Sequence, residues 1–162
     1  MARYLKTLLP SYLPVALAMH YHGITDTAQF TLARDILIPL GEYFQVQDDY
    51  LDCFAPPATL GKIGTDILDN KNSWVVNIAL QLVNPAQRKI LDDNYGRKDD
   101  PQAEARVKEV FKAVGVEAKY KAYEKKAYEQ IVGLVQTVPA EGGQLKRDVF
   151  MAFLSKIFGR TM

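Results

Sequence analysis

Residues 27–54 of the chain read TAQFTLARDILIPLGEYFQVQDDYLDCF, and their apolar side chains return every three or four positions. The side chains that share this stripe are Leu32, Ile36, Leu40, Tyr43 and Tyr50. A stripe with that spacing is typical of an amphipathic helix that lays one face on a protein core. The segment therefore predicts a helix from about Thr27 to Phe54, capped by Thr25 or Asp26 and kinked near Pro39.

The same helical spacing continues on both sides of this segment. Upstream, a stripe from Tyr12 to His20 predicts a shorter helix that Gly23 closes. Downstream, caps and glycine breaks divide the chain into further helices, expected at 73–83, from 84 onward, 101–114, 116–138 and 145–158. No segment alternates in the manner of a strand, so the sequence predicts an all-α helical bundle, with residues 1–162 as a single domain.

The composition is that of an ordinary globular protein: 48% of the 162 residues are hydrophobic and 24% are charged. The net charge of +1 gives no overall attraction to nucleic acid. Cys53 is the one cysteine, which excludes an internal disulfide and a cysteine-cluster metal site. No apolar run reaches the roughly 18 residues of a membrane span. We therefore expect a cytoplasmic protein with no membrane span and no nucleic-acid partner.

The strongest chemical signal is an acidic stripe near the end of the long helix. Gln45, Asp48, Asp49 and Asp52 fall on one side of that helix. The three carboxylates repel one another and oppose the helix dipole, and a bound cation relieves both costs. Mg²⁺ prefers such oxygen ligands, often together with a substrate phosphate. The competing interpretation is a solvated acidic face, and the stripe taken alone favours neither.

The polar loop from Ala55 to Asn72 favours the metal. It carries Lys62 and Lys71, whose ammonium groups suit phosphate oxygens, and glycines that let the backbone approach a ligand closely. It also adds Asp66 and Asp69. Acids for a metal and lysines for phosphate, joined by a glycine-bearing loop, predict a metal–diphosphate site. The order of a P-loop is absent.

Three segments of this region resemble a known family. Residues 44–52 read FQVQDDYLD, residues 61–67 read GKIGTDI and residues 69–74 read DNKNSW. They resemble the second aspartate-rich motif and the following loop of farnesyl diphosphate synthases, in the fungal-like branch of the trans-prenyltransferases. Residues 12–19, YLPVALAM, with Gly23 match a helix that the family places just upstream. The resemblance extends over nearly all of the chain.

The resemblance implies the isoprenoid synthase fold and a prenyltransferase that condenses isopentenyl diphosphate with an allylic diphosphate. In that scheme Mg²⁺ neutralises the leaving diphosphate. The resemblance assigns the metal to Asp48 and Asp66, with Asp49 and Asp52 supporting it directly or through water. We expect no other cofactor.

The resemblance also assigns the substrate contacts. Lys62 would hold the allylic diphosphate, and Lys71 would lie at the edge of that site. Gln45 would line the pocket beside the reacting carbons, which makes Asp48, Lys62 and Gln45 the expected catalytic set. Lys6-Thr7 resembles the family's diphosphate-binding Lys-Thr pair, although one residue is missing between this pair and Tyr12.

The sequence departs from the family chiefly in extent. Family members are longer, and their first aspartate-rich motif lies in an N-terminal half that has no counterpart in this sequence. The resemblance therefore implies a truncated, C-terminal form that is poorly active alone. Half of a helical bundle leaves apolar helix faces without partners, so we expect a homodimer or a larger assembly.

Two other functions remain open from the sequence. One is a non-catalytic binding or structural protein derived from the same fold, and the other is a related terpene cyclase. Several residues have ordinary explanations: Cys53 is expected as a small packing group and Trp74 as a core residue. His20 and His22 flank a helix end without a partner at ligand spacing, so no metal or catalytic role is expected for them. The basic and aromatic positions of 116–138 are balanced by glutamates and predict a solvated helix face.

Overall fold

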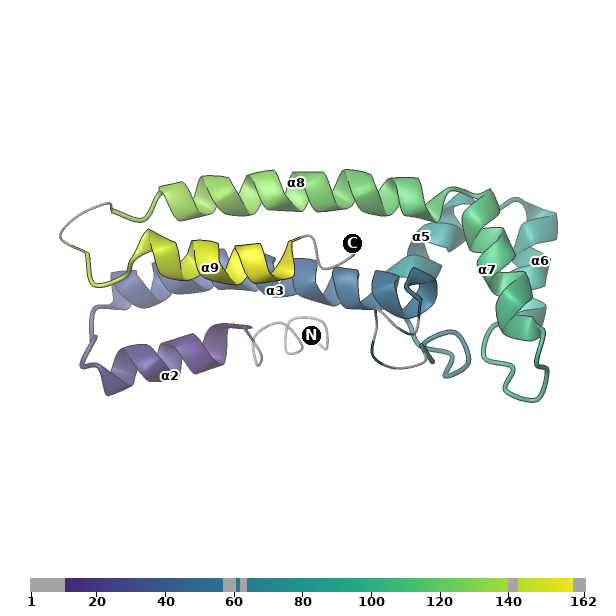
Figure 1. The fold of residues 1–162 in the computed structure, drawn as a ribbon, viewed down its shortest axis with the longest axis horizontal. Helices are drawn as coiled ribbons and strands as arrows, with labels where there is room; N and C mark the ends of the chain where they lie inside the picture. The colour runs from purple at the N-terminus through teal and green to yellow at the C-terminus, as the bar shows by residue number, and fades with distance from the viewer. Residues whose placement is uncertain (1–10, 57–60, 62–63, 140–142, 159–162) are drawn as a thin grey trace. The chain divides into compact units, whose positions relative to one another are not determined.

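The computed structural model describes residues 11–56, 61, 64–139 and 143–158 (Figure 1). Every regular element in these ranges is a helix, which confirms the all-α prediction. The helices are α2 (Leu13–Tyr21), α3 (Thr27–Phe54), α5 (Trp74–Leu82), α6 (Pro85–Asn94), α7 (Ala103–Ala113), α8 (Val116–Gln136) and α9 (Arg147–Ile157). Three predicted site residues, Lys6, Thr7 and Lys62, lie outside the described residues.

Side-chain caps start several helices where the sequence predicts them. Asp26 accepts a hydrogen bond from the Ala28 N–H at 2.9 Å, which decides between the two cap candidates for α3. Ser73 caps α5, and Asn84 forms a capping box with Gln87 at the start of α6. Each cap satisfies backbone donors that the first helical turn leaves without intrahelical partners.

Two helix starts differ from the predictions. We predict a helix from Pro101, but α7 begins at Ala103, because Asp100 accepts a hydrogen bond from the Gln102 N–H at 2.8 Å and closes a turn first. We predict the last helix from Leu145, but α9 begins at Arg147. The Arg147 guanidinium donates to the carbonyl oxygens of Gln136, the last residue of α8, and of Val138, two residues further on.

The contacts divide the chain into two compact units, and α3 and α8 each contribute to both. The first unit contains the described residues up to Gln45 and those from Glu124 onward, and the second contains Val46–Tyr123. In the first unit, the Tyr43 hydroxyl donates to Glu124 Oε1 at 2.7 Å and ties α3 to α8. The single-domain assignment of the whole chain stays a prediction.

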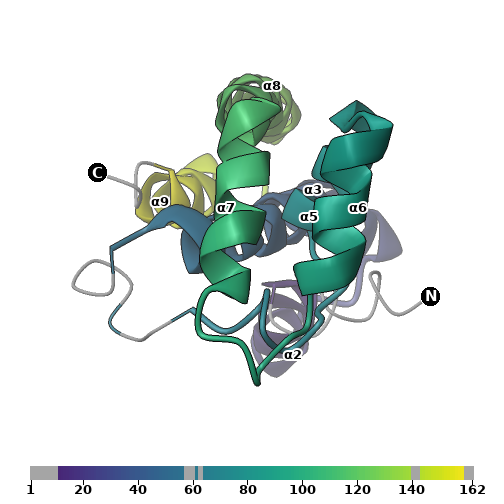
Figure 2. The ribbon, with the colours of Figure 1, turned by 90° about the vertical axis from the view of Figure 1, so that its right-hand side faces the viewer.

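The second unit packs around stacked aromatic rings. Tyr50 of α3 and Tyr120 of α8 stack with ring centroids 3.8 Å apart and planes 3° from parallel. Trp74 is half-buried and packs against Tyr120 and Tyr123 with centroid distances of 6.2 and 5.6 Å. α6 and α7 lie side by side in this unit (Figure 2). The aromatic stack fixes the end of α3 that carries the acidic stripe.

Within the described ranges, none of the helices combines the length and the apolar character that crossing a membrane requires. Cys53 is 3% exposed and belongs to the core of the second unit, as expected of a packing residue.

Candidate functional site

The acidic side chains of α3 meet the polar turn between α3 and α5 within the second unit. The centre of this cluster is the ammonium group of Lys71. Its Nζ lies 3.0 Å from Asp49 Oδ1 and 2.6 Å from Asp66 Oδ2. Two carboxylates from separate parts of the chain therefore converge on one cation. We call Asp49, Asp66 and Lys71 the ion triad.

Backbone groups hold each member of the ion triad. The second oxygen of Asp49, Oδ2, accepts a hydrogen bond from the Trp74 N–H at 2.7 Å. The Asp66 N–H donates to Asp52 Oδ2 at 2.8 Å. The Tyr95 hydroxyl donates to the Lys71 carbonyl oxygen at 2.8 Å, and the Lys71 N–H donates to the Asp66 carbonyl oxygen at 3.0 Å. The turn is thus fixed to α3, α5 and the end of α6.

Gly64 lets the turn approach α3 closely enough for these bonds. A Cβ atom built on Gly64 would stand 1.9 Å from the Asp52 carbonyl oxygen, far inside van der Waals contact. Both partners are backbone, so neither can rotate away. Glycine is the residue type that fits here, since it has no side chain to exclude.

A second set of contacts braces the far side of the turn. The Gly96 N–H donates to the Ile67 carbonyl oxygen at 2.9 Å, and Lys98 pairs with Asp69 at 2.6 Å. Asn70 has φ 53°, a left-handed conformation that asparagine tolerates better than most residues. These contacts connect the turn to the segment between α6 and α7.

Burial and charge act in opposite directions on the ion triad. Burial raises the pKa of the Asp66 carboxyl above its ordinary value, although the Lys71 ammonium counteracts this. Burial would lower the pKa of Lys71, but hydrogen bonds to Asp66 and Asp49 outweigh it and raise that pKa above its ordinary value. Lys71 is therefore a permanent cation at physiological pH.

The predicted site residues do not all lie in the ion triad. Asp48 is half-buried on α3, directly before Asp49, and forms no ion pair with any described residue. Asp52 reaches the turn by accepting a hydrogen bond from the Asp66 N–H. Gln45 is half-buried one helical turn before Asp49. Lys71, predicted at the edge of a diphosphate site, pairs with the two carboxylates of Asp49 and Asp66.

The donor set fits a hard divalent cation. In the described part of the chain no three acidic, histidine or cysteine side chains converge as a complete cage. Mg²⁺ does not need one, since it commonly binds one or two carboxylates and keeps several waters. The convergence of Asp49 and Asp66 on an ammonium group shows that this arrangement accommodates a cation. Asp48, Asp49, Asp52 and Asp66 are the residues that could hold Mg²⁺ or its waters.

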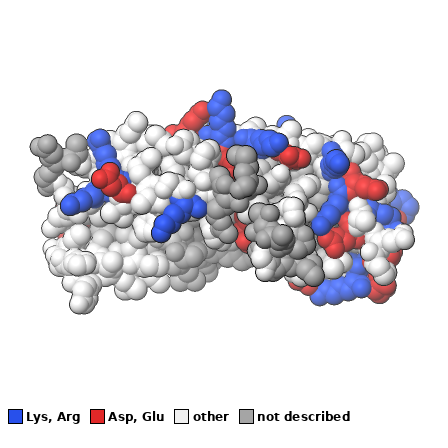
Figure 3. Space-filling view, in the orientation of Figure 1, with Lys and Arg blue, Asp and Glu red and all other residues white. Residues whose placement is uncertain are grey.

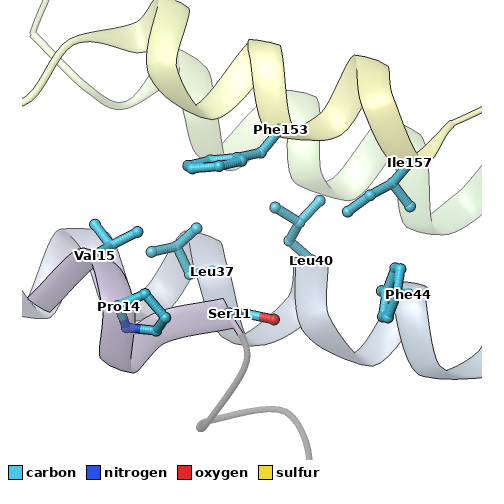
Figure 4. A pocket seen from close by; sticks show the side chains of 8 residues that line it. All are labelled: Ser11, Pro14, Val15, Leu37, Leu40, Phe44, Phe153 and Ile157. Atoms are coloured by element: carbon cyan, nitrogen blue, oxygen red, sulfur yellow. The ribbon is translucent and has the colours of Figure 1, made fainter.

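A cavity of about 260 Å³ lies in the first unit and has a different character (Figure 4). Its walls are apolar side chains of α2, α3 and α9, including Leu40, Phe44 and Phe153, together with Ser11. Its described lining includes none of the predicted acids and no charged group that could hold a metal or a phosphate.

Sequence reasoning missed two residues that position the ion triad. Tyr95 is far from Lys71 in sequence, and only its place just after α6 brings its hydroxyl to the Lys71 carbonyl. Gly64 stands out in the sequence as a glycine, but nothing local reveals that it touches the Asp52 backbone. Gly96 shortly after the predicted α6 was the one available sign that this segment turns back.

We expect alkaline pH to destabilise the fold through Cys53 and Tyr95. Burial raises the pKa of each group to about 12, from ordinary values of 9.0 and 10.0. The unfolded chain releases these protons first, so the free energy of unfolding falls as pH rises between about pH 9 and about pH 12. Urea unfolding across this window measures the fall, and a Cys53→Ala, Tyr95→Phe double variant should show a clearly smaller one. An equal fall in both proteins would contradict the assignment.

A sequence model of the polyprenyl synthetase family matches residues 2–114, which include the whole ion triad. Among curated proteins, the farnesyl pyrophosphate synthase of Ganoderma lucidum is 57% identical over 159 residues, covering 92% of this chain and 44% of that protein. The synthase of Saccharomyces cerevisiae is 53% identical over 150 residues, covering 93% and 42%. The chain thus spans less than half the length of these relatives.

Solved structures show the same likeness in three dimensions. A farnesyl diphosphate synthase of T. brucei in complex with a bisphosphonate aligns with a TM-score of 0.87 at 29% identity, covering 99% of this chain and 54% of that chain. The same organism's synthase in complex with risedronate gives a TM-score of 0.79 at 31% identity, with coverages of 98% and 43%.

Proposed function

Because this chain belongs to the polyprenyl synthetase family, we propose that it supplies one of the two acidic surfaces that bind Mg²⁺ and diphosphate in a farnesyl diphosphate synthase-like prenyltransferase. We call this surface, formed by Asp48, Asp49, Asp52 and Asp66, the second wall. The reaction would join isopentenyl diphosphate to an allylic diphosphate. The observation that carries the proposal is the convergence of Asp49 and Asp66 on one cation, with Asp48 beside them on α3. A helical protein with an apolar core and a site where carboxylates surround a cation suits an apolar substrate that ends in a diphosphate.

Each residue has a distinct task in this proposal. Asp48 and Asp66 would bind Mg²⁺, and Asp49 and Asp52 would support it directly or through water. When bound, the ion acts as a Lewis acid that neutralises charge on the departing diphosphate. Lys62 would bind the allylic diphosphate.

Three further residues would complete the substrate site. Gln45, one turn before Asp49 on α3, would lie beside the reacting carbons. Lys71 would contribute charge at the edge of the diphosphate, and Lys6 and Thr7 would also bind the diphosphate. Positioning of this kind lowers a barrier because the charges are already oriented before the reaction begins.

The direct test is calorimetric binding of Mg²⁺ with diphosphate to the wild type and to Asp48→Asn. We expect the variant to bind at least about tenfold more weakly, since one charged ligand of the ion is lost. Asp35→Asn is the matched control: Asp35 lies on the same helix, is exposed, and pairs with its neighbour Arg34 and no other described residue. Lys62→Ala should weaken diphosphate more than the metal. Equal binding by wild type and Asp48→Asn would refute the proposed site.

We also propose that the chain forms a homodimer or a larger assembly. Leu13, Leu17 and Tyr21 follow one another at four-residue spacing on α2, with 39%, 60% and 88% of their surfaces exposed. The face drawn in Figure 3 is largely uncharged over this helix. Exposed apolar stripes are uncommon on monomers and usually mark interfaces, and two-fold symmetry is the commonest closure.

Sedimentation at tens of micromolar measures this association. We expect a dimer or larger species from the wild type and a shift toward monomer in Leu17→Glu, which places a charge in the middle of the stripe. Lys89→Met, at an exposed position on α6, should leave the assembly unchanged. A wild-type monomer that binds no hydrophobic dye would contradict the proposal.

The cytoplasm is the compartment that we propose for this protein. A lone thiol, buried at Cys53, is compatible with a reducing environment. Cell fractionation with an antibody to the chain tests this assignment.

A further inference from the structure

The ammonium of Lys71 lies between two carboxylates. Among the ion pairs of the described residues, Lys71 is the one cation shared by two carboxylates. Those carboxylates are also sheltered, with 16% of the Asp49 side chain and 10% of the Asp66 side chain exposed. By contrast, Lys89 pairs with a single, largely exposed aspartate at the surface of α6. Sheltered like charges repel strongly unless a cation lies between them.

One carboxylate and the main chain of the other residue are held by bonds that do not involve the Lys71 side chain. Asp49 accepts from the Trp74 N–H through the oxygen that does not face Lys71. The Asp66 main chain is fixed through its own N–H, which donates to Asp52. Removing the ammonium group therefore leaves Asp49 Oδ1 in place and the Asp66 main chain fixed opposite it. We call the space between the two carboxylates the cradle.

The Lys71 side chain can leave this cradle while its backbone stays fixed. The Tyr95 hydroxyl holds the Lys71 carbonyl and the Asp66 carbonyl holds its N–H, so the anchor is in the main chain. The side chain itself is 32% exposed and has a flexible four-carbon stem. The ammonium group can therefore reach solvent without disturbing the turn.

From these three observations we propose that Lys71 is a built-in substitute for a divalent cation. It neutralises Asp49 and Asp66 while no metal is bound, and a divalent cation that enters the cradle displaces its ammonium group. The displaced group then adds its positive charge to the entrance, where an anionic ligand such as a diphosphate meets it. This inference rests on the proposed function for the second ligand, but the exchange of ammonium for metal needs no diphosphate.

The exchange is tested with a metal alone. Binding of Mn²⁺, followed by electron paramagnetic resonance, is compared among the wild type, Lys71→Met, Lys71→Arg and the control Lys89→Met. We expect Lys71→Met to bind Mn²⁺ at least about tenfold more tightly than the wild type, because the internal competitor is gone and its two carboxylates are unpaired. Lys71→Arg and Lys89→Met should stay near the wild-type affinity. Asp66→Asn added to Lys71→Met should abolish the gain.

Stability provides the second readout. In EDTA, Lys71→Met should unfold at a lower urea concentration than Lys89→Met, and Mn²⁺ or Mg²⁺ should restore most of the loss. If Lys71→Met does not fold in EDTA, refolding on addition of metal supports the exchange. Failure to refold with any metal concentration, while Lys71→Arg folds normally, overturns it.

Unchanged Mn²⁺ affinity in a folded Lys71→Met also overturns the exchange. These outcomes are independent of diphosphate binding by Asp48, so they separate this inference from the proposed function.

Discussion

Replacing Gly64 with alanine is expected to lower the free energy of unfolding by about 3 kcal/mol, because a methyl group must enter a space already filled by backbone. The Cβ atom would stand 1.9 Å from the Asp52 carbonyl oxygen. Relief requires the turn to move away from α3. That movement breaks the hydrogen bond from the Asp66 N–H to Asp52 Oδ2, which is 2.8 Å long in the native structure.

Gly133→Ala is the matched control for this variant. Gly133 lies inside α8, and nothing stands within 4 Å of the Cβ that alanine would add. Alanine is favoured over glycine in a helix by roughly 0.5–1 kcal/mol, so this variant should be slightly more stable than the wild type. Urea unfolding at neutral pH measures both changes. Equal midpoints for Gly64→Ala and wild type would show that the turn does not depend on this close approach.

Gly64→Ala should also weaken Mn²⁺ binding, since Asp66 moves with the turn. A loss of stability without a loss of metal affinity would mean that Asp66 keeps its place by other contacts. The contacts of Gly96 with Ile67 and of Lys98 with Asp69 are the candidates for that role. The variant therefore shows whether Asp66 is held mainly by the contact of the turn with α3 or by its contacts with the segment between α6 and α7.

The helices could be predicted because their causes are local. The stripe of α3 and the cap at Asn84 each depend on residues a few positions apart, so a sequence displays them directly. The same holds for the acidic stripe, since Asp48, Asp49 and Asp52 share a helix face through helical spacing alone. The starts of α7 and α9 were misplaced because side chains there bond to turns and to the end of another helix.

The arrangement of the site could be predicted only in part. The acidic and basic residues indicated a site for a metal cation and a diphosphate anion. The resemblance to farnesyl diphosphate synthases indicated which aspartates would bind the metal. The pairing of Lys71 with Asp49 depends on how the turn folds back onto α3, and the support from Tyr95 depends on where α6 ends. Contacts of that kind leave no periodic signal in one sequence.

The largest catalytic effect is expected for the chain alone. With isopentenyl and geranyl diphosphates and Mg²⁺, the 162 residues should form product at least about 10³-fold more slowly than a whole synthase, since removing a single oriented donor already costs about 10²–10³-fold. The resemblance places the opposite acidic wall, which carries the first aspartate-rich motif, and most of the isopentenyl diphosphate site in a part of the family chain that these residues do not include. A homodimer would bring a second copy of the same wall, not the opposite one.

Adding in trans the portion of the Saccharomyces cerevisiae relative that this chain does not match provides the test. The resemblance implies that this portion is N-terminal and carries the first aspartate-rich motif. Radiolabelled product should then appear, and Asp48→Asn in this chain should abolish it, whereas Asp35→Asn should not. Turnover by the chain alone near the rate of a whole synthase, lost in Asp48→Asn, would show that one wall suffices. No turnover in trans, despite native Mg²⁺–diphosphate binding, would favour a non-catalytic protein built on the same fold. The two measurements thus answer separate questions. The metal affinity shows whether this chain binds Mg²⁺ and diphosphate, and the turnover shows whether the reaction also needs the opposite acidic surface.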